Sequence, residues 1–258
     1  MAQWLRYVAI GDSFTEGLED PGPDGRHRGW ADRVAEGLDG PGFEYANLAI
    51  RGRLLDPILT EQLPVALAME PDLITIAGGV NDALRPGWDL TVMARLWEQA
   101  LTATEASGAD VYLVTFGQPS RRSRALGRIE TRLADYRQIM LDTAARHGAR
   151  VVDFWYASVF DDPRFWASDR LHLSPLGHER VAQAVLDEMG HQTPDWLAPL
   201  PAADPVPPWS RAAADAAWIG GHLGPWLGRR ITGRSSGDGL QPKRPRLAPL
   251  VNAPETSG

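Results

Sequence analysis

Short apolar runs alternate along this chain with longer segments of helical periodicity, and this alternation limits the fold more than any other feature. The apolar runs, read as strands, are residues 7–10, 45–50, 73–77, 111–116 and 151–154. The segments with helical spacing are residues 30–38, 58–69, 90–107, 126–147 and 178–189. Alternation of this kind predicts an α/β fold, with a parallel sheet covered by helices on both faces.

Composition excludes several classes of protein and of site. The 258 residues carry a net charge of −7, which argues against a nucleic-acid partner, because such partners require a basic face. The absence of cysteine excludes disulfides, cysteine nucleophiles and thiolate zinc sites. No apolar run approaches the ~18 residues that span a bilayer, and the one near the N-terminus is too short for a secretory signal. We therefore expect a cytoplasmic protein.

The character of the sequence changes after Gly190. Residues 191–258 hold 11 of the 21 prolines, yet also four of the ten tryptophans, which disordered linkers usually lack. We expect a main domain over residues 1–190 and an extension over 191–258. Within the extension, a helix over 209–230 is predicted to dock on the main domain, and the tail from 233 onward is predicted to be disordered. The alternative for the helix is contact with a membrane surface.

Polar or glycine positions follow four of the expected strands. Ser13 lies just past the first strand, Gly52 past the second and Asn81 past the third, while Asp169 and His172 follow the fifth after a loop. The carboxyl ends of parallel strands meet at one edge of the sheet, where ligands bind in such folds. These residues are therefore expected to converge on one site.

Taken singly, each of these residues has an ordinary structural interpretation. A serine after a Gly-Asp turn is more often an N-cap or turn residue, and Asn81 equally suits a turn or a helix cap. Gly52 alone is a loop glycine, and His172 alone suits a cap or the core. Their order along the chain, at one sheet edge, is what favours a shared chemical role.

Two further motif matches are set aside. Asp24 and His27 repeat the Asp-x-x-His spacing, but they lie in a Gly/Pro-rich loop and are expected to be solvated. Residues 233–237 match the Gly-x-Ser-x-Gly elbow, which needs a preceding strand, a following helix and a later histidine. No histidine follows His222, so this match is rejected.

Together, the blocks GDSF with Ser13, the second block with Gly52, GVND with Asn81, and DRLH with Asp169 and His172 resemble the SGNH/GDSL hydrolase family. The resemblance covers roughly residues 5–190 and leaves the extension outside it. It implies a flavodoxin-like three-layer α/β/α sandwich with five parallel strands, followed here by the proline-rich C-terminal extension. One small departure is a phenylalanine after the serine, where the family has leucine.

The resemblance also implies a role for each residue. Ser13 is the expected nucleophile, His172 the general base and acid, and Asp169 the group that orients the imidazole. The oxyanion hole is expected to comprise the backbone N–H groups of Ser13 and Gly52 and the side-chain amide of Asn81. No metal or cofactor is expected.

These roles imply hydrolysis of a carboxylic ester through an acyl-enzyme intermediate, with a small acyl ester as the partner. An acyltransferase would use the same residues, and a non-catalytic protein that binds phosphate or flavin on the same scaffold is the second alternative. The sequence leaves the ester open among acetylated sugars, short-chain esters, thioesters and lysophospholipids. It also leaves open the oligomeric state.

Overall fold

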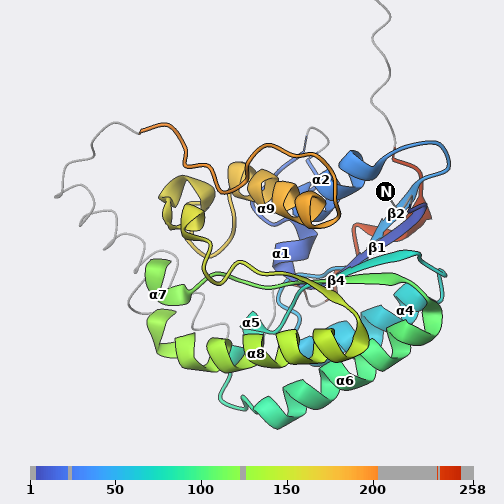
Figure 1. Cartoon of the computed structure of the whole chain (residues 1–258), viewed down its shortest axis with the longest axis horizontal. Coiled ribbons are helices and arrows are strands. Elements are labelled where there is room, and N and C mark those ends of the chain that lie inside the picture. Colours follow the sequence, from blue (N-terminus) through green and yellow to red (C-terminus); the bar gives the residue numbers. More distant parts are fainter. Residues whose placement is uncertain (1–3, 23–24, 123–125, 203–236, 238, 251–258) are drawn as a thin grey trace, which may run out of the picture.

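A central sheet lies between two layers of helices (Figure 1). The computed structural model describes residues 4–22, 25–122, 126–202, 237 and 239–250. Within these ranges six strands pair in the order β5-β4-β3-β1-β2-β6. They are β1 (Arg6–Ile10), β2 (Glu44–Asn47), β3 (Leu73–Ile76), β4 (Asp110–Val114), β5 (Arg150–Val152) and β6 (Arg244–Ala248). Strands β1 to β5 are parallel and have the flavodoxin-like order, so all five predicted strands are confirmed.

Alternating side chains of each strand feed two separate cores. In β1, Tyr7 and Ala9 join one buried cluster, and Val8 and Ile10 join the other. The first cluster is covered by α2 (Gly29–Leu38) and α9 (Pro175–Glu188) (Figure 1). The second is covered by α4 (Leu63–Leu67), α6 (Leu90–Ser107) and α8 (Glu130–His147) (Figure 1). Both faces of the sheet are thus buried under helices, which agrees with the continuous apolar sequence of the strands.

Most of the predicted helical segments are found, with differences at their ends and one interruption. Helix α6 has the predicted bounds, because Asp89 caps its N-terminus and Gly108 takes a left-handed conformation at its end. The expected helix 58–69 is instead the π-helical turn η1 (Ile58–Gln62) followed by α4, and the short helix α3 (Leu55–Pro57) precedes them. None of the helices in the described ranges is long and apolar enough to cross a membrane.

The sixth strand corrects the sequence-based prediction. Strand β6 pairs antiparallel with β2 at the edge of the sheet, opposing Ala248 to Tyr45 and Arg244 to Asn47. The sheet therefore has six strands rather than five, and the prediction of disorder after residue 233 is wrong for this segment. Proline at positions 245 and 249 argued against a strand in the sequence. An edge strand nevertheless accepts proline, because one side of it makes no hydrogen bonds to another strand. The predicted helix 209–230 lies outside the described residues.

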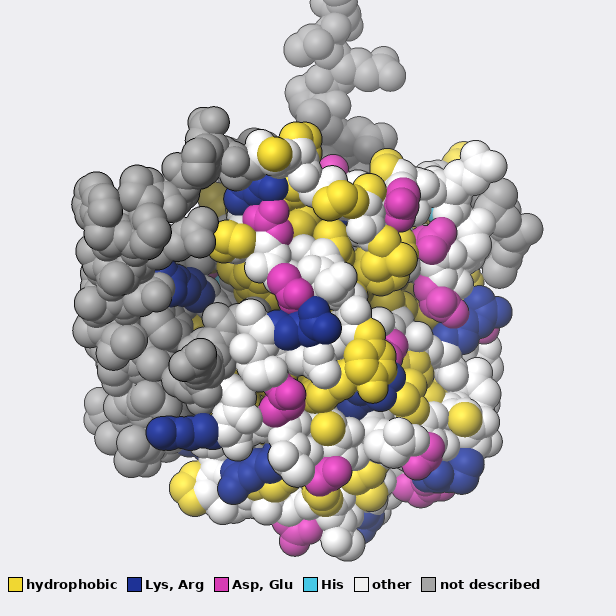
Figure 2. Space-filling model, turned by 60° about the vertical axis from the view of Figure 1, so that its left-hand side comes forward, with side chains coloured by type: hydrophobic (Ala, Val, Ile, Leu, Met, Phe, Trp, Pro, Cys, Tyr) yellow, Lys and Arg dark blue, Asp and Glu magenta, His cyan; other side chains and the backbone are white. Residues whose placement is uncertain are grey.

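The surface mixes charges of both signs. On the face shown in Figure 2, basic and acidic side chains alternate with apolar ones, and the described residues form no extended patch of one sign there. The candidate site residues lie instead at the edge of the sheet where the carboxyl ends of the parallel strands meet.

Candidate active site

The turn after β1 presents Ser13. Strand β1 ends at Ile10, and α1 (Ser13–Glu16) begins three residues later. A side chain on Gly11 would place its Cβ 2.6 Å from the Ala77 carbonyl, so this close approach of two strand ends requires glycine. Asp12 caps the helix, its Oδ1 accepting from the Phe14 N–H at 3.1 Å. Ser13 thus stands at the helix N-terminus, above the sheet edge.

The structure brings together Ser13, His172 and Asp169. His172 Nε2 lies 3.2 Å from Ser13 Oγ, and His172 Nδ1 lies 2.5 Å from Asp169 Oδ2. The other carboxylate oxygen of Asp169 accepts from the backbone N–H groups of Leu171 and His172, each at 3.0 Å. This Asx-type turn explains the spacing of two residues between Asp169 and His172, because the carboxylate folds the loop back on its own histidine.

Asp169 is held in its charged form. Burial disfavours that charge, but the His172 ring and the two backbone N–H groups outweigh burial and lower the pKa of Asp169 to about 2. The carboxylate therefore stays ionised at neutral pH. Its hydrogen bond fixes the His172 ring so that Nε2 faces Ser13.

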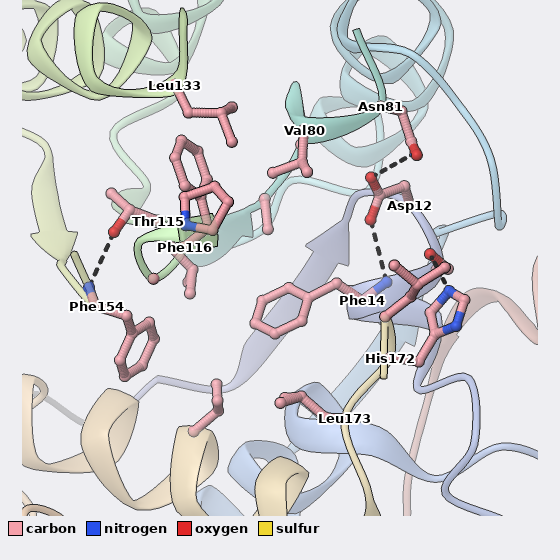
Figure 3. A pocket seen from close by; sticks show the side chains of 18 of the residues that line it. Asp12, Phe14, Val80, Asn81, Thr115, Phe116, Leu133, Phe154, His172 and Leu173 are labelled. Carbon is pink, nitrogen blue, oxygen red and sulfur yellow. Dashed lines mark hydrogen bonds between the residues drawn. The ribbon is translucent and has the colours of Figure 1, made fainter. Parts of the chain in front are cut away.

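Asn81 lies beside this group, on α5 (Val80–Ala83) past the end of β3. The amide nitrogen of Asn81 donates to Asp12 Oδ2 at 2.9 Å (Figure 3) and to the Arg53 carbonyl at 3.0 Å. Gly79, which precedes the helix, has φ of +94°, and a Cβ there would lie 2.2 Å from Tyr136 Oη. The structure therefore brings Asn81 to the site but directs its amide at Asp12 and the Arg53 carbonyl.

Gly52 occupies a tight turn between two anchored residues. Its φ of +77° lies in the left-handed region that favours glycine. On one side, the Glu16 carboxylate accepts from the Arg51 N–H at 2.7 Å and pairs with the Arg51 guanidinium. On the other side, the Arg53 carbonyl accepts from Asn81. Gly52 is buried but does not line the cavity described below.

Sequence reasoning missed several residues that shape the site. Asp12 both caps α1 and holds Asn81, while Gln62 binds both backbone groups of Gly11, at 2.8 and 3.0 Å. Glu16 fixes the turn at Arg51. Only Asp12 had a usable signal, since aspartate before a helix is a preferred N-cap. Gln62 and Glu16 act across sequence separations that no local pattern reveals.

His178 has a structural role next to the site. Its Nδ1 accepts from the Trp30 N–H at 3.2 Å, and its Nε2 donates to the Leu18 carbonyl at 3.1 Å. Burial lowers the pKa of His178 to about 4, so the ring is neutral in the folded protein near neutral pH. The side chain therefore ties α9 to α2 and to the segment after α1.

The buried His178 predicts a loss of stability in mild acid. Between about pH 6.5 and pH 4 the unfolded chain binds a proton at this residue that the folded protein excludes, so the free energy of unfolding falls as pH falls. The loss from this group is about 2–3 kcal/mol over that range. Urea denaturation at pH 7 and pH 4.5 measures it, with His178→Gln as the non-titrating variant. Equal pH slopes for the two proteins would contradict the prediction.

An apolar cavity of about 160 Å³ opens beside Ser13 and His172. Its walls come from the ends of β1, β3, β4 and β5 and from helices α8 and α9. Figure 3 shows Asp12, Asn81 and His172 on one side and Phe116, Phe154 and Leu133 on the other. The apolar walls also include Phe14, Leu18, Val80, Leu84, Val114, Leu126, Ile129, Phe160, Trp166, Leu171, Leu173 and Val181.

The described residues of the two motif matches that were set aside do not line this cavity. His27 is not among its lining residues, and Asp24 lies outside the described residues. Of the elbow match at 233–237, only Gly237 is described. In the described part of the chain, no three His, Asp or Glu side chains are grouped to hold a metal ion.

Comparison with known proteins gives a consistent picture of the fold. A model of the GDSL-like lipase/acylhydrolase family matches residues 9–180. An acetylxylan esterase from Geobacillus stearothermophilus is similar with a TM-score of 0.62 and 22% identity, over 74% of this chain and 95% of its own. A lipase/acylhydrolase from Enterococcus faecalis gives 0.58 and 22%, over 72% and 95%. An alpha/beta hydrolase from the metagenome of Lake Arreo, Spain, gives 0.60 and 21%, over 74% and 97%. No curated protein matched.

Proposed function

Because the chain belongs to the GDSL-like lipase/acylhydrolase family, we propose that it hydrolyses carboxylic esters with Ser13 as nucleophile, through an acyl-enzyme intermediate. The observation that carries this proposal is the continuous relay from Ser13 Oγ through the His172 ring to Asp169. A serine hydroxyl is a weak nucleophile without an adjacent base, and the relay supplies that base.

Each group in the relay has a defined step. His172 Nε2 takes the Ser13 proton as Ser13 Oγ bonds to the carbonyl carbon, and Asp169 stabilises the imidazolium that forms. When the tetrahedral intermediate collapses, the imidazolium gives this proton to the departing alcohol. Water then attacks the acyl-enzyme by the same route, which releases the carboxylic acid and restores Ser13.

The tetrahedral intermediate carries a negative oxygen that needs donors. In the proposed mechanism these are the Ser13 and Gly52 N–H groups and the Asn81 amide. Both amide hydrogens of Asn81 have acceptors, namely Asp12 and the Arg53 carbonyl. The oxyanion therefore competes with the neutral Arg53 carbonyl for one amide hydrogen of Asn81. The oxyanion is charged, so it is the stronger hydrogen-bond acceptor of the two.

The cavity supports an apolar acyl group as the part of the ester that is recognised. Apart from Ser13, His172 and their neighbours, its walls are mostly apolar side chains. A cavity of about 150 Å³ holds a benzene molecule, so a volume of about 160 Å³ accommodates an acyl chain of about six carbons. An acetyl group would leave most of this apolar wall without contacts.

Chain-length preference tests the function and the pocket together. For a series of p-nitrophenyl esters we expect kcat/KM to rise from acetate to hexanoate by about fourfold per buried methylene, and to fall again at dodecanoate. Leu133→Ala, which enlarges the pocket, should shift the optimum to longer chains. Leu101→Ala, in the core below the sheet and away from the pocket, should leave the optimum unchanged.

Different failures of this experiment have different meanings. A flat chain-length profile would contradict the role of the pocket and leave ester hydrolysis intact. If no ester is cleaved and a serine-directed fluorophosphonate labels nothing, the proposed function itself is wrong. Adding an acceptor alcohol distinguishes the acyltransferase alternative, because transfer then yields a new ester in place of free acid.

A further inference from the structure

The only lysine of the chain lies far from the cavity-lining residues in sequence yet close to the nucleophile's helix in space. Lys243 directly precedes β6, beyond the residues that the family model matches. Its Nζ donates to the backbone carbonyls of Glu16 at 2.6 Å, His27 at 2.8 Å and Arg28 at 2.9 Å. It also pairs with the partly buried carboxylate of Asp32.

The three carbonyls come from the end of α1 and from the two residues that precede α2. Glu16 is the last residue of α1, which Ser13 begins, and Arg28 immediately precedes α2. The backbones of Gly17 and Gly29 touch here, since a Cβ on Gly29 would lie 2.4 Å from the Gly17 Cα. Neither glycine can carry a side chain at this contact, and the adjacent carbonyls accept hydrogen bonds from the Lys243 ammonium.

The same segment also contacts the turn that carries Gly52. A Cβ on Gly237 would lie 2.1 Å from the Arg51 carbonyl, so the chain here lies directly on that turn. Glu16, whose carbonyl accepts from Lys243, also binds the Arg51 N–H through its carboxylate. The C-terminal segment therefore contacts both pieces of backbone from which the proposed nucleophile and the proposed backbone oxyanion donor come.

We propose that Lys243 is a positioning residue that fixes α1, and with it Ser13, relative to the turn at Gly52. The proposal rests on the proposed function, and Lys243 acts through the Glu16 carbonyl without touching the substrate. A buried ion pair is by itself weak evidence for stability, because desolvation offsets the attraction between the charges. What distinguishes this lysine is that three backbone carbonyls, together with the Asp32 carboxylate, converge on one ammonium group.

The test compares Lys243 with its neighbour Arg244, the first residue of β6, in the full chain. Lys243→Met removes the contacts to α1 and α2. Arg244→Met removes hydrogen bonds to the Tyr45, Ala248 and Pro249 carbonyls, which hold the strand but touch neither helix. We expect Lys243→Met to lower kcat by about 10- to 100-fold with little change in KM, because small displacements of reacting groups are costly. Labelling by fluorophosphonate should slow in parallel, while Arg244→Met keeps kcat within about twofold of wild type.

A rescue experiment separates positioning from loss of stability. Because the chain has no native cysteine, the Lys243→Cys variant has a single thiol. This thiol can be alkylated in the unfolded protein, which is then refolded. Aminoethylation restores an ammonium at nearly the length of lysine and should restore kcat, whereas S-methylation should not. Lys243→Arg is expected to retain only part of the wild-type kcat. The planar guanidinium of arginine does not fit three carbonyls that converge on a point.

Two results would overturn the proposal. One is a Lys243→Met protein that is folded and has wild-type kcat and labelling rate. The other is an equal loss of kcat in Arg244→Met at equal loss of unfolding free energy, which would assign the effect to the strand as a whole. If the wild-type chain neither cleaves esters nor reacts with fluorophosphonate, the proposed function fails first and this inference falls with it.

Discussion

Ser13→Ala is expected to lower kcat for ester hydrolysis by about 10⁴- to 10⁶-fold, and His172→Ala by a similar factor. The two side chains form one relay, with His172 Nε2 3.2 Å from Ser13 Oγ. Without the histidine the hydroxyl keeps its proton, and without the hydroxyl the histidine has nothing to activate. The double variant should therefore lose no more than either single variant. Steady-state kinetics on hexanoate esters, with circular dichroism as the check on folding, measures all three proteins.

Matched controls decide whether the correct histidine has been chosen. His27 follows the other Asp-x-x-His spacing, so His27→Gln should retain activity close to wild type. Asp169→Asn should lower kcat by up to about 10⁴-fold, because an amide no longer stabilises the imidazolium. A greater loss in His27→Gln than in His172→Ala would reject the assignment. Loss of activity in EDTA would move the chemistry to a metal-dependent class.

The sequence predicts the sheet well because each strand and helix shows its buried face locally. The apolar run of β1 and the regular apolar spacing of α6 need no long-range information. The relay was predictable for a related reason. Parallel strands deliver their carboxyl ends to one edge, so the order of Ser13, Asp169 and His172 along the chain implies their proximity in space.

What the sequence does not predict depends on contacts between distant segments. Strand β6 exists because the edge of β2 offers unpaired backbone groups, and its prolines conceal it from any propensity argument. The bond between Lys243 and the Glu16 carbonyl joins residues 227 positions apart. The direction of the Asn81 amide is likewise set by Asp12 and Arg53, which only the folded chain brings together.

Asn81→Ala is expected to lower kcat by about 10²- to 10³-fold with KM nearly unchanged, because an oxyanion donor acts mainly as charge develops. A purely structural asparagine predicts another result. Its loss leaves acceptors at Asp12 and Arg53 without their donor, at a cost of about 1–3 kcal/mol in unfolding free energy, and leaves kcat of the folded enzyme intact. Kinetics well below the melting transition therefore separate the two roles.

The structure also shows why Asn81→Asp alone is a poor discriminator. The amide nitrogen lies 2.9 Å from Asp12 Oδ2, so a carboxylate there would face a second carboxylate and destabilise the site whatever its catalytic role. Combining Asn81→Asp with Asp12→Asn reverses the direction of that hydrogen bond and removes the like-charge contact. If Asn81 donates to the oxyanion, the double variant should regain unfolding free energy over Asn81→Asp and stay as slow. If kcat returns together with stability, Asn81 serves only to hold Asp12, and the oxyanion hole must be formed without its amide.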